Sequence, residues 1–415
     1  MTLPLKRKNV FTQEDRELSK ILNADALGFQ MIWTYFGQNI YQNKINSATF
    51  DIRNFNLNLF NHYVIYKLSK IEKLPLLNNR KNIEKILILL ENLVVWSWYK
   101  EEGFDKTGLS GTTNAEIKWK EKSINTTLSS SRNTLELIQS QHIYGINGKY
   151  KGSFISMGFF DSDYRYDETK MQEVEILINE NEDLKILNHE VFNWLINENR
   201  EVEKIPTKSY LAVFGKSKDN QIDKHTKHFW LQNLGFDKDD AKIFYELIDV
   251  TDKTQNLKIM FTDASSKSSN NYFNHILIIE PIMAYIDKLF KYLLFLDSKP
   301  ISDIPSKYFK PIIDFDFKQF ELEDMSSVAT RIEELSKIKD VKSLIEYHTN
   351  LMFQRNKLPW IEIKDDKLKV LMIKHENIDF YKKYLDDKVD DIKSIDWIHD
   401  YYKGAVRRIK TGLES

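Results

Sequence analysis

The chain has no cysteine, which excludes disulfide bonds, thiolate chemistry and cysteine-based zinc sites. Neither charge is in excess, because 60 Lys and Arg residues offset 61 Asp and Glu residues. This balance argues against a globally basic nucleic-acid-binding protein, although it allows a local basic patch. The longest apolar runs, residues 85–96 and 277–296, are interrupted by charged residues and are not typical of membrane spans. We therefore expect a cytoplasmic protein that does not enter a membrane.

Hydrophobic residues make up 42% of the 415 positions and aromatic residues 13%, which indicates a folded protein with a substantial core. The length exceeds the size at which a single core usually stops growing, so more than one subdomain is expected. Residues 54–71 and 82–99 carry apolar side chains at the three- and four-residue spacing of partly buried helices. Residues 360–373 alternate around Asp365 and Asp366, which predicts a β-hairpin. The sequence thus predicts a mainly α-helical fold with small β-hairpin elements.

Four consecutive domains are predicted from the distribution of helical patterns, glycines and prolines. They are a helical N-terminal unit (1–112), a glycine- and aromatic-rich module (113–205), a helical middle unit (206–299) and a helical C-terminal unit with the hairpin (300–415). The polar residues 264–271 are a candidate boundary, and Pro300, Pro305 and Pro311 predict a stiff linker. Pro281 predicts a kink or a break in the long helix around it.

Glycine is concentrated at the end of the first of these domains and in the second. Seven of the 13 glycines lie between Gly103 and Gly158, a density typical of backbone that needs positive φ or a close approach. A short helix at residues 132–141 precedes an aromatic, glycine-turned segment that reaches residue 160. This order is compatible with a winged-helix-like module and equally with a buried connector.

Basic and aromatic side chains meet in this same segment. Arg132, Lys149, Tyr150 and Lys151 combine positive charge with an aromatic ring, as nucleic-acid-binding surfaces do. We predict these four residues as the nucleic-acid-binding set, with DNA as the ligand. A solvated loop would carry the same residues.

Glu362 and Lys364 have the spacing of the second half of a restriction-type nuclease motif. Alternate residues of a strand face the same side, so the carboxylate could hold a divalent metal while the lysine positions a water molecule. The motif also needs a neighbouring acid, and the nearest upstream candidates, Asp314 and Asp316, are separated from it by helical sequence. An amphipathic hairpin with a charged outer face explains the same pair.

Other catalytic motifs are incomplete. The GKS sequence at residues 215–217 ends like a phosphate-binding loop, but Tyr210 occupies the position that requires glycine. His225 and His228 share a helix face, whereas a metal site needs a third and a fourth ligand. We therefore assign no catalytic residue, no metal and no cofactor, and we expect a binding protein rather than an enzyme.

Five short segments resemble a set of uncharacterised prokaryotic proteins encoded near antiphage defence genes. The segments are ALGF (26–29), FNHYVIY (60–66), GLSG (108–111), YKGSFISMGFF (150–160) and PWIEIKDDKLKV (359–370). No catalytic residues are established for those proteins. The resemblance implies a non-enzymatic subunit of a multi-protein bacterial antiphage defence complex, acting with an ATPase or nuclease from a neighbouring gene. With the basic residues above, it predicts binding to partner proteins and nucleic acid; the alternative is a metal-dependent nuclease.

Overall fold

A computed structural model describes residues 25–71, 79–197, 200–215, 224–252, 254–320, 326–372 and 378–414. These residues are mainly helical, with one two-stranded antiparallel sheet, so the predicted fold class is confirmed. Among the described residues, no helix combines the length and the apolar character needed to cross a membrane.

The chain forms two compact units, and each is assembled from separate stretches of sequence. Unit 1 takes residues up to Gly37 together with Asn256–Tyr401, and unit 2 takes Gln38–Gln255 together with Tyr402–Ser415. The four predicted domains are consecutive, whereas these two units interleave along the chain.

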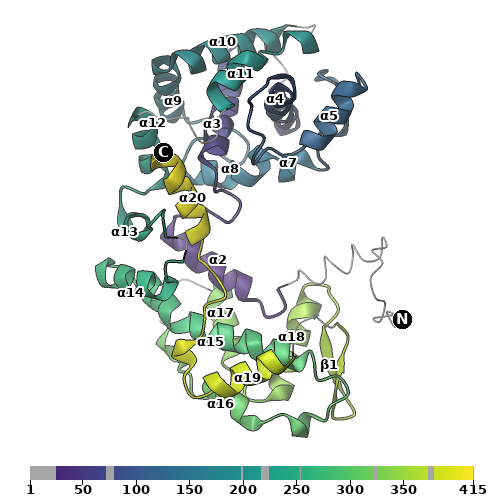
Figure 1. Cartoon of the computed structure of the whole chain (residues 1–415), viewed down its shortest axis with the longest axis vertical. Coiled ribbons are helices and arrows are strands. Elements are labelled where there is room, and N and C mark those ends of the chain that lie inside the picture. Colours follow the sequence, from purple (N-terminus) through teal and green to yellow (C-terminus); the bar gives the residue numbers. More distant parts are fainter. Residues whose placement is uncertain are drawn as a thin grey trace. The chain divides into compact units, whose positions relative to one another are not determined.

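Unit 2 is built around two long helices, α3 (Ile52–Ser69) and α4 (Arg80–Lys100), which match the predicted helical stretches. Asp51 and Asn79 begin them, because each side chain accepts a backbone N–H of the first turn. Helices α5, α6, α7 and α11 pack against α4, and α8, α9 and α10 pack against α3 (Figure 1).

The remaining bounds in unit 2 are α5 Thr112–Lys120, α6 Arg132–Leu135, α7 Gln141–Tyr144, α8 Ile146–Ser156, α9 Glu168–Glu180, α10 Glu182–Ile196, the 3₁₀ turn η2 Val202–Lys204, α11 Thr207–Phe214, α12 Lys224–Leu234, α13 Asp239–Leu247 and α20 Lys403–Glu414. Between residues 113 and 205 the described backbone contains no strand, only a single bridge from Phe160 to Tyr166. The segment compatible with a wing is instead helical, as α7 and α8, so a winged-helix module is not formed there.

Unit 1 contains α14 Leu257–Lys267, α15 Tyr272–Leu293, η3 Ile301–Asp303, η4 Ser306–Phe309, α16 Lys310–Ile313, η5 Phe317–Gln319, α17 Ser326–Leu335, α18 Val341–Gln354, β1 Ile361–Lys364, β2 Lys367–Val370, α19 Ile378–Lys388 and η6 Ile392–Ser394; α2 (Phe29–Ile40) starts in this unit. The predicted hairpin is confirmed: β1 pairs with β2, and Asp365 and Asp366 turn the chain with φ of 53° and 54°. The predicted proline linker is wrong, because Tyr308, Phe309 and Pro311 are buried in this unit.

Helix α15 continues through Pro281 without a break. The preceding residue, Glu280, is fully buried, and its carboxylate accepts four hydrogen bonds. The donors are Trp33 Nε1 (2.8 Å), the backbone N–H groups of Ile398 (2.9 Å) and His399 (3.1 Å), and the hydroxyl of Tyr401 (2.7 Å). One side chain thereby holds α2 and the segment after η6 against α15.

His348 makes a second buried link in unit 1. Its Nε2 accepts the backbone N–H of Trp360 (2.8 Å), so its Nδ1 carries the proton and donates to the carbonyl of Ala26 (2.8 Å). Burial lowers the pKa of His348 to about 4, which keeps the ring neutral. The ALGF and PW segments, more than 300 residues apart in the sequence, therefore meet at one imidazole.

We expect Glu280→Leu to lower the free energy of unfolding by about 3 kcal/mol, because it leaves four donors that converge on one buried carboxylate without an acceptor. Urea denaturation followed by circular dichroism measures the change. Glu346→Leu, at an exposed position of α18, is the matched control. Equal stability of the two variants would show that Glu280 does not hold unit 1 together.

Candidate nucleic-acid interface

The predicted nucleic-acid-binding residues belong to the glycine-rich module, whose short helices α6 and α7 pack on α4 and whose α8 packs on α3. Two glycines permit this packing by close approach. A Cβ atom at Gly145 would stand 2.4 Å from Glu91 Oε2, and one at Gly148 would stand 2.2 Å from the carbonyl oxygen of Ile143. Any side chain at either position would push α7 and α8 away from α4 or from each other.

A buried carboxylate fixes the two short helices in place. Glu91 of α4 accepts the backbone N–H of Asn147 (2.6 Å) and a hydrogen bond from Gln141 Nε2 (3.2 Å). Gln141 also donates to Asn92 Oδ1 (3.0 Å), and Asn92 donates to the carbonyl of Leu135 (2.8 Å). Helices α6, α7 and α8 are thus each bonded to the middle of α4.

His62 of α3 closes this network from the other side. Asn147 donates through Nδ2 to the Tyr164 hydroxyl (3.1 Å), so its Oδ1 faces His62 Nε2 (2.9 Å) and accepts from it. His62 Nδ1 then accepts from the Tyr166 hydroxyl (2.9 Å). Burial lowers the pKa of His62 to about 3. A neutral ring with both nitrogens occupied positions its neighbours and is not available as a base.

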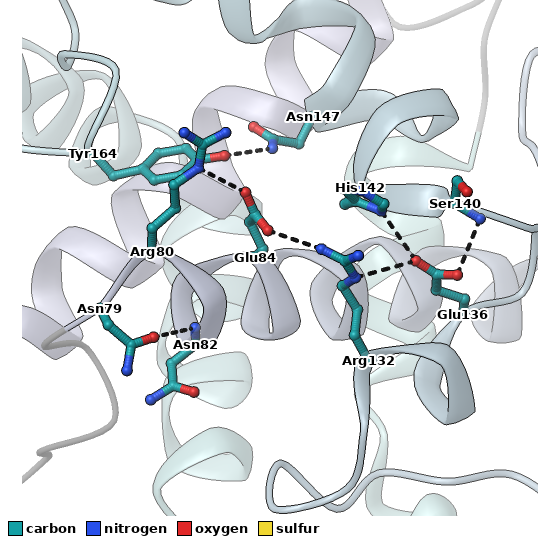
Figure 2. Close-up of polar contacts among 10 residues, drawn as sticks. All are labelled: Asn79, Arg80, Asn82, Glu84, Arg132, Glu136, Ser140, His142, Asn147 and Tyr164. Atoms are coloured by element: carbon teal, nitrogen blue, oxygen red, sulfur yellow. Dashed lines mark hydrogen bonds and ion pairs between the residues drawn. The ribbon is translucent and has the colours of Figure 1, made fainter.

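Outside this core, charged side chains of alternating sign form a ladder. Arg80 Nε lies 2.9 Å from Glu84 Oε1, and Arg132 lies 3.2 Å from Glu84 Oε2 and 3.7 Å from Glu136 Oε1. His142 Nδ1 lies 3.3 Å from the same Glu136 oxygen. Figure 2 shows Glu84 between the two arginines and Glu136 between Arg132 and His142.

Exposure separates the two signs of charge in this ladder. The side chains of Glu84 and Glu136 are 10% and 8% exposed, whereas those of Arg80 and Arg132 are 57% and 34% exposed. The carboxylates are therefore recessed and hold the guanidinium groups, while the guanidinium groups reach solvent. A fixed, outward-facing cation is suited to a phosphate oxygen.

The structure separates the four predicted residues. Arg132 belongs to the ladder, and Lys149 is exposed on α8. Lys151 is half-buried; its ammonium lies 3.9 Å from the centre of the Tyr164 ring and donates to the carbonyl of Ser162 (2.9 Å). Tyr150 is 1% exposed, packs on Phe55 and cannot offer its ring to a ligand in this conformation.

Three residues of this face were missed by the sequence analysis. Arg80 and His142 extend the ladder, and Tyr144, at the end of α7, is 60% exposed. Arg80 lies 52 positions before Arg132 in the sequence, so only the fold brings it beside Arg132. Tyr144 carried a usable signal, because it is an aromatic residue beside a glycine in the segment already singled out.

The predicted nuclease pair lies in unit 1, on β1. Glu362 is opposite Lys369 on β2 and forms an ion pair with it (2.7 Å), while Lys364 is exposed opposite Lys367. Nowhere in the described parts of the chain do three or more His, Asp or Glu side chains gather as metal ligands would. His225 pairs with Glu180 (3.7 Å), and Lys216 and Ser217 of the GKS sequence lie outside the described residues.

Compared with known proteins, the chain matches no family model, no curated protein sequence and no solved structure.

Glu91 makes the stability of unit 2 depend on pH in a defined direction. Burial raises the pKa of Glu91 to about 7 in the folded protein. The folded state therefore binds more protons than the unfolded state between about pH 4.5 and 7, so this group's contribution to stability falls as pH rises through that window. Glu91→Gln does not titrate. We expect the free energy of unfolding of Glu91→Gln, taken relative to that of the unsubstituted protein, to increase by up to about 3 kcal/mol from pH 5 to pH 8.

Urea denaturation of both proteins at several pH values measures this difference. A stability difference that stays constant across the window would contradict the prediction.

Proposed function

We propose that this protein is a non-enzymatic subunit of a multi-protein bacterial antiphage defence complex that binds partner proteins and nucleic acid. The nucleic acid contacts the face of unit 2 formed by Arg80, Arg132 and Lys149, with the imidazole of His142 beside them; this is hereafter the cationic face. The partners are an ATPase or a nuclease encoded by a neighbouring gene, as the sequence resemblance implies.

The proposal that this protein binds nucleic acid rests on one observation: the arginine side chains of the ladder are more exposed than its glutamate side chains. Because the carboxylates are recessed and already bonded to cations, an approaching polyanion meets the arginines first. Lys149 adds an exposed ammonium group, and the half-buried Lys151 lies two residues further along α8. Asp161 and Asp163 act electrostatically on Lys151.

A binding role is also favoured by how the buried polar groups are used. His62, Glu91 and Glu280 are the kind of groups that active sites employ, yet each is bonded to neighbours within its own unit. These bonds hold helices together and leave the groups without access to a substrate.

We expect Lys149→Gln and Arg80→Gln each to weaken DNA binding roughly threefold or more and to reduce the salt slope by about one, because each removes one phosphate contact. Fluorescence polarisation with a labelled 20-base-pair duplex, titrated at several salt concentrations, measures both quantities. Lys337→Gln is the matched control, because Lys337 is an exposed lysine of unit 1 paired with Glu333. Unchanged slopes in both test variants would rule out the cationic face.

The alternative function, a metal-dependent nuclease using Glu362 and Lys364, is favoured only by their placement at alternate positions of one strand. It predicts cleavage of plasmid DNA by the purified protein with Mg²⁺ or Mn²⁺, abolished by Glu362→Ala. Cleavage of this kind would overturn the non-enzymatic proposal.

Co-expression with the products of neighbouring genes, followed by size-exclusion chromatography, tests the partner-protein part of the proposed function separately.

A further inference from the structure

The end of α7 presents an apolar and aromatic surface next to the cationic face. Ile143 is 52% exposed and Tyr144 is 60% exposed, although both are large hydrophobic residues in a well-packed unit. Exposed aromatic side chains among cations are the pattern by which proteins hold unpaired bases.

This surface rests on a rigid support. Gln141, in the same turn, is 5% exposed and makes three hydrogen bonds: to Glu91, to Asn92 and from the backbone N–H of Leu137 (2.8 Å). The close contact between Gly148 and the carbonyl of Ile143 fixes the other side of α7. Ile143 and Tyr144 therefore stand on a turn that is anchored to α4 and α8, and little conformational freedom would be lost when a ligand packs on them.

Basic side chains lie on both sides of Tyr144 along the chain. His142 is bonded into the ladder through Glu136. Gly145 follows Tyr144, and its carbonyl accepts the N–H of Lys149 (3.2 Å). The exposed Lys149 therefore lies one helical turn after Gly145. A nucleic-acid strand with a phosphate at Lys149 and a hydrogen bond to His142 would bring its bases close to the Tyr144 ring.

We infer that the nucleic acid bound at the cationic face is single-stranded, and that Tyr144 is its stacking platform, with Ile143 packing beside the stacked base. This inference rests on the proposed function and specifies its ligand. In a duplex the faces of the bases are covered by their neighbours, so a protein can reach the phosphates, the sugars and the base edges but has no base face on which to stack. An unpaired base offers its face, and stacking then adds to the phosphate contacts without depending on sequence.

The test compares fluorescein-labelled dT12 with a labelled 12-base-pair duplex. We expect Tyr144→Ala to weaken dT12 binding roughly 5- to 150-fold, the range that base–aromatic stacking supports. Duplex affinity and the salt slopes of both probes should stay unchanged, because no phosphate contact is lost. Tyr144→Phe keeps the ring and should retain dT12 binding. Phe380→Ala, at a 54% exposed aromatic residue of unit 1, is the control for a general surface effect.

The outcomes separate the inference from the function on which it rests. If the protein binds both probes and Tyr144→Ala changes neither, the inference fails while the proposed function stands. If Tyr144→Ala instead disrupts the complex with a partner protein and leaves dT12 binding intact, the surface is a protein-docking site and the inference is wrong. If neither probe binds to the unsubstituted protein, the nucleic-acid part of the proposed function fails with it.

Discussion

The arrangement of unit 2 depends on the hydrogen bond from the Asn147 N–H to the buried Glu91 carboxylate. An acid in the middle of a buried helix is costly unless donors surround it, and here the donors come from the glycine-rich segment. That requirement explains the glycine at position 145, since any larger residue would occupy the space of the carboxylate. The charge ladder and the exposed end of α7 depend on this contact together with the bonds of Gln141 and Asn92, which hold α7 and α6 on α4.

Unit 1 uses the same device with different elements. Glu280 gathers four donors, and His348 joins two backbone segments that are distant in the sequence. In each case one buried polar side chain joins separate segments of the chain. Several apolar contacts could also join them, but they would fix the relative positions of the segments less tightly. Polar links of this kind specify a single arrangement of helices, because a shifted helix would leave a donor or an acceptor unpaired.

The sequence predicted the parts of this fold that follow from periodicity. Helices α3 and α4 and the hairpin of β1 and β2 were expected, because apolar spacing and paired turn residues report local structure directly. The structure of the glycine-rich segment was less predictable, because a sequence does not distinguish a glycine that lets two helices approach closely from a glycine that forms a turn. Tyr150 was predicted as a binding residue for that reason; once α8 is recognised, its spacing from Phe154 places it on the buried face. Arg80 and Arg132 come together only in the folded chain.

The interleaving of the two units has a consequence for shortened forms of the protein. The chain changes unit after Gly37, after Gln255 and again after Tyr401, so the last helix, α20, completes a unit that began 365 residues earlier. Gly412 of that helix lies so close to Ile52 that a Cβ atom there would approach its side chain within 2.5 Å. A premature stop near residue 401 would thus leave the residues of unit 1 complete, while unit 2 would lose α20 and expose apolar surface on α3. Proteolytic fragments of this protein cannot be equated with its units, because a single cut cannot release either one whole.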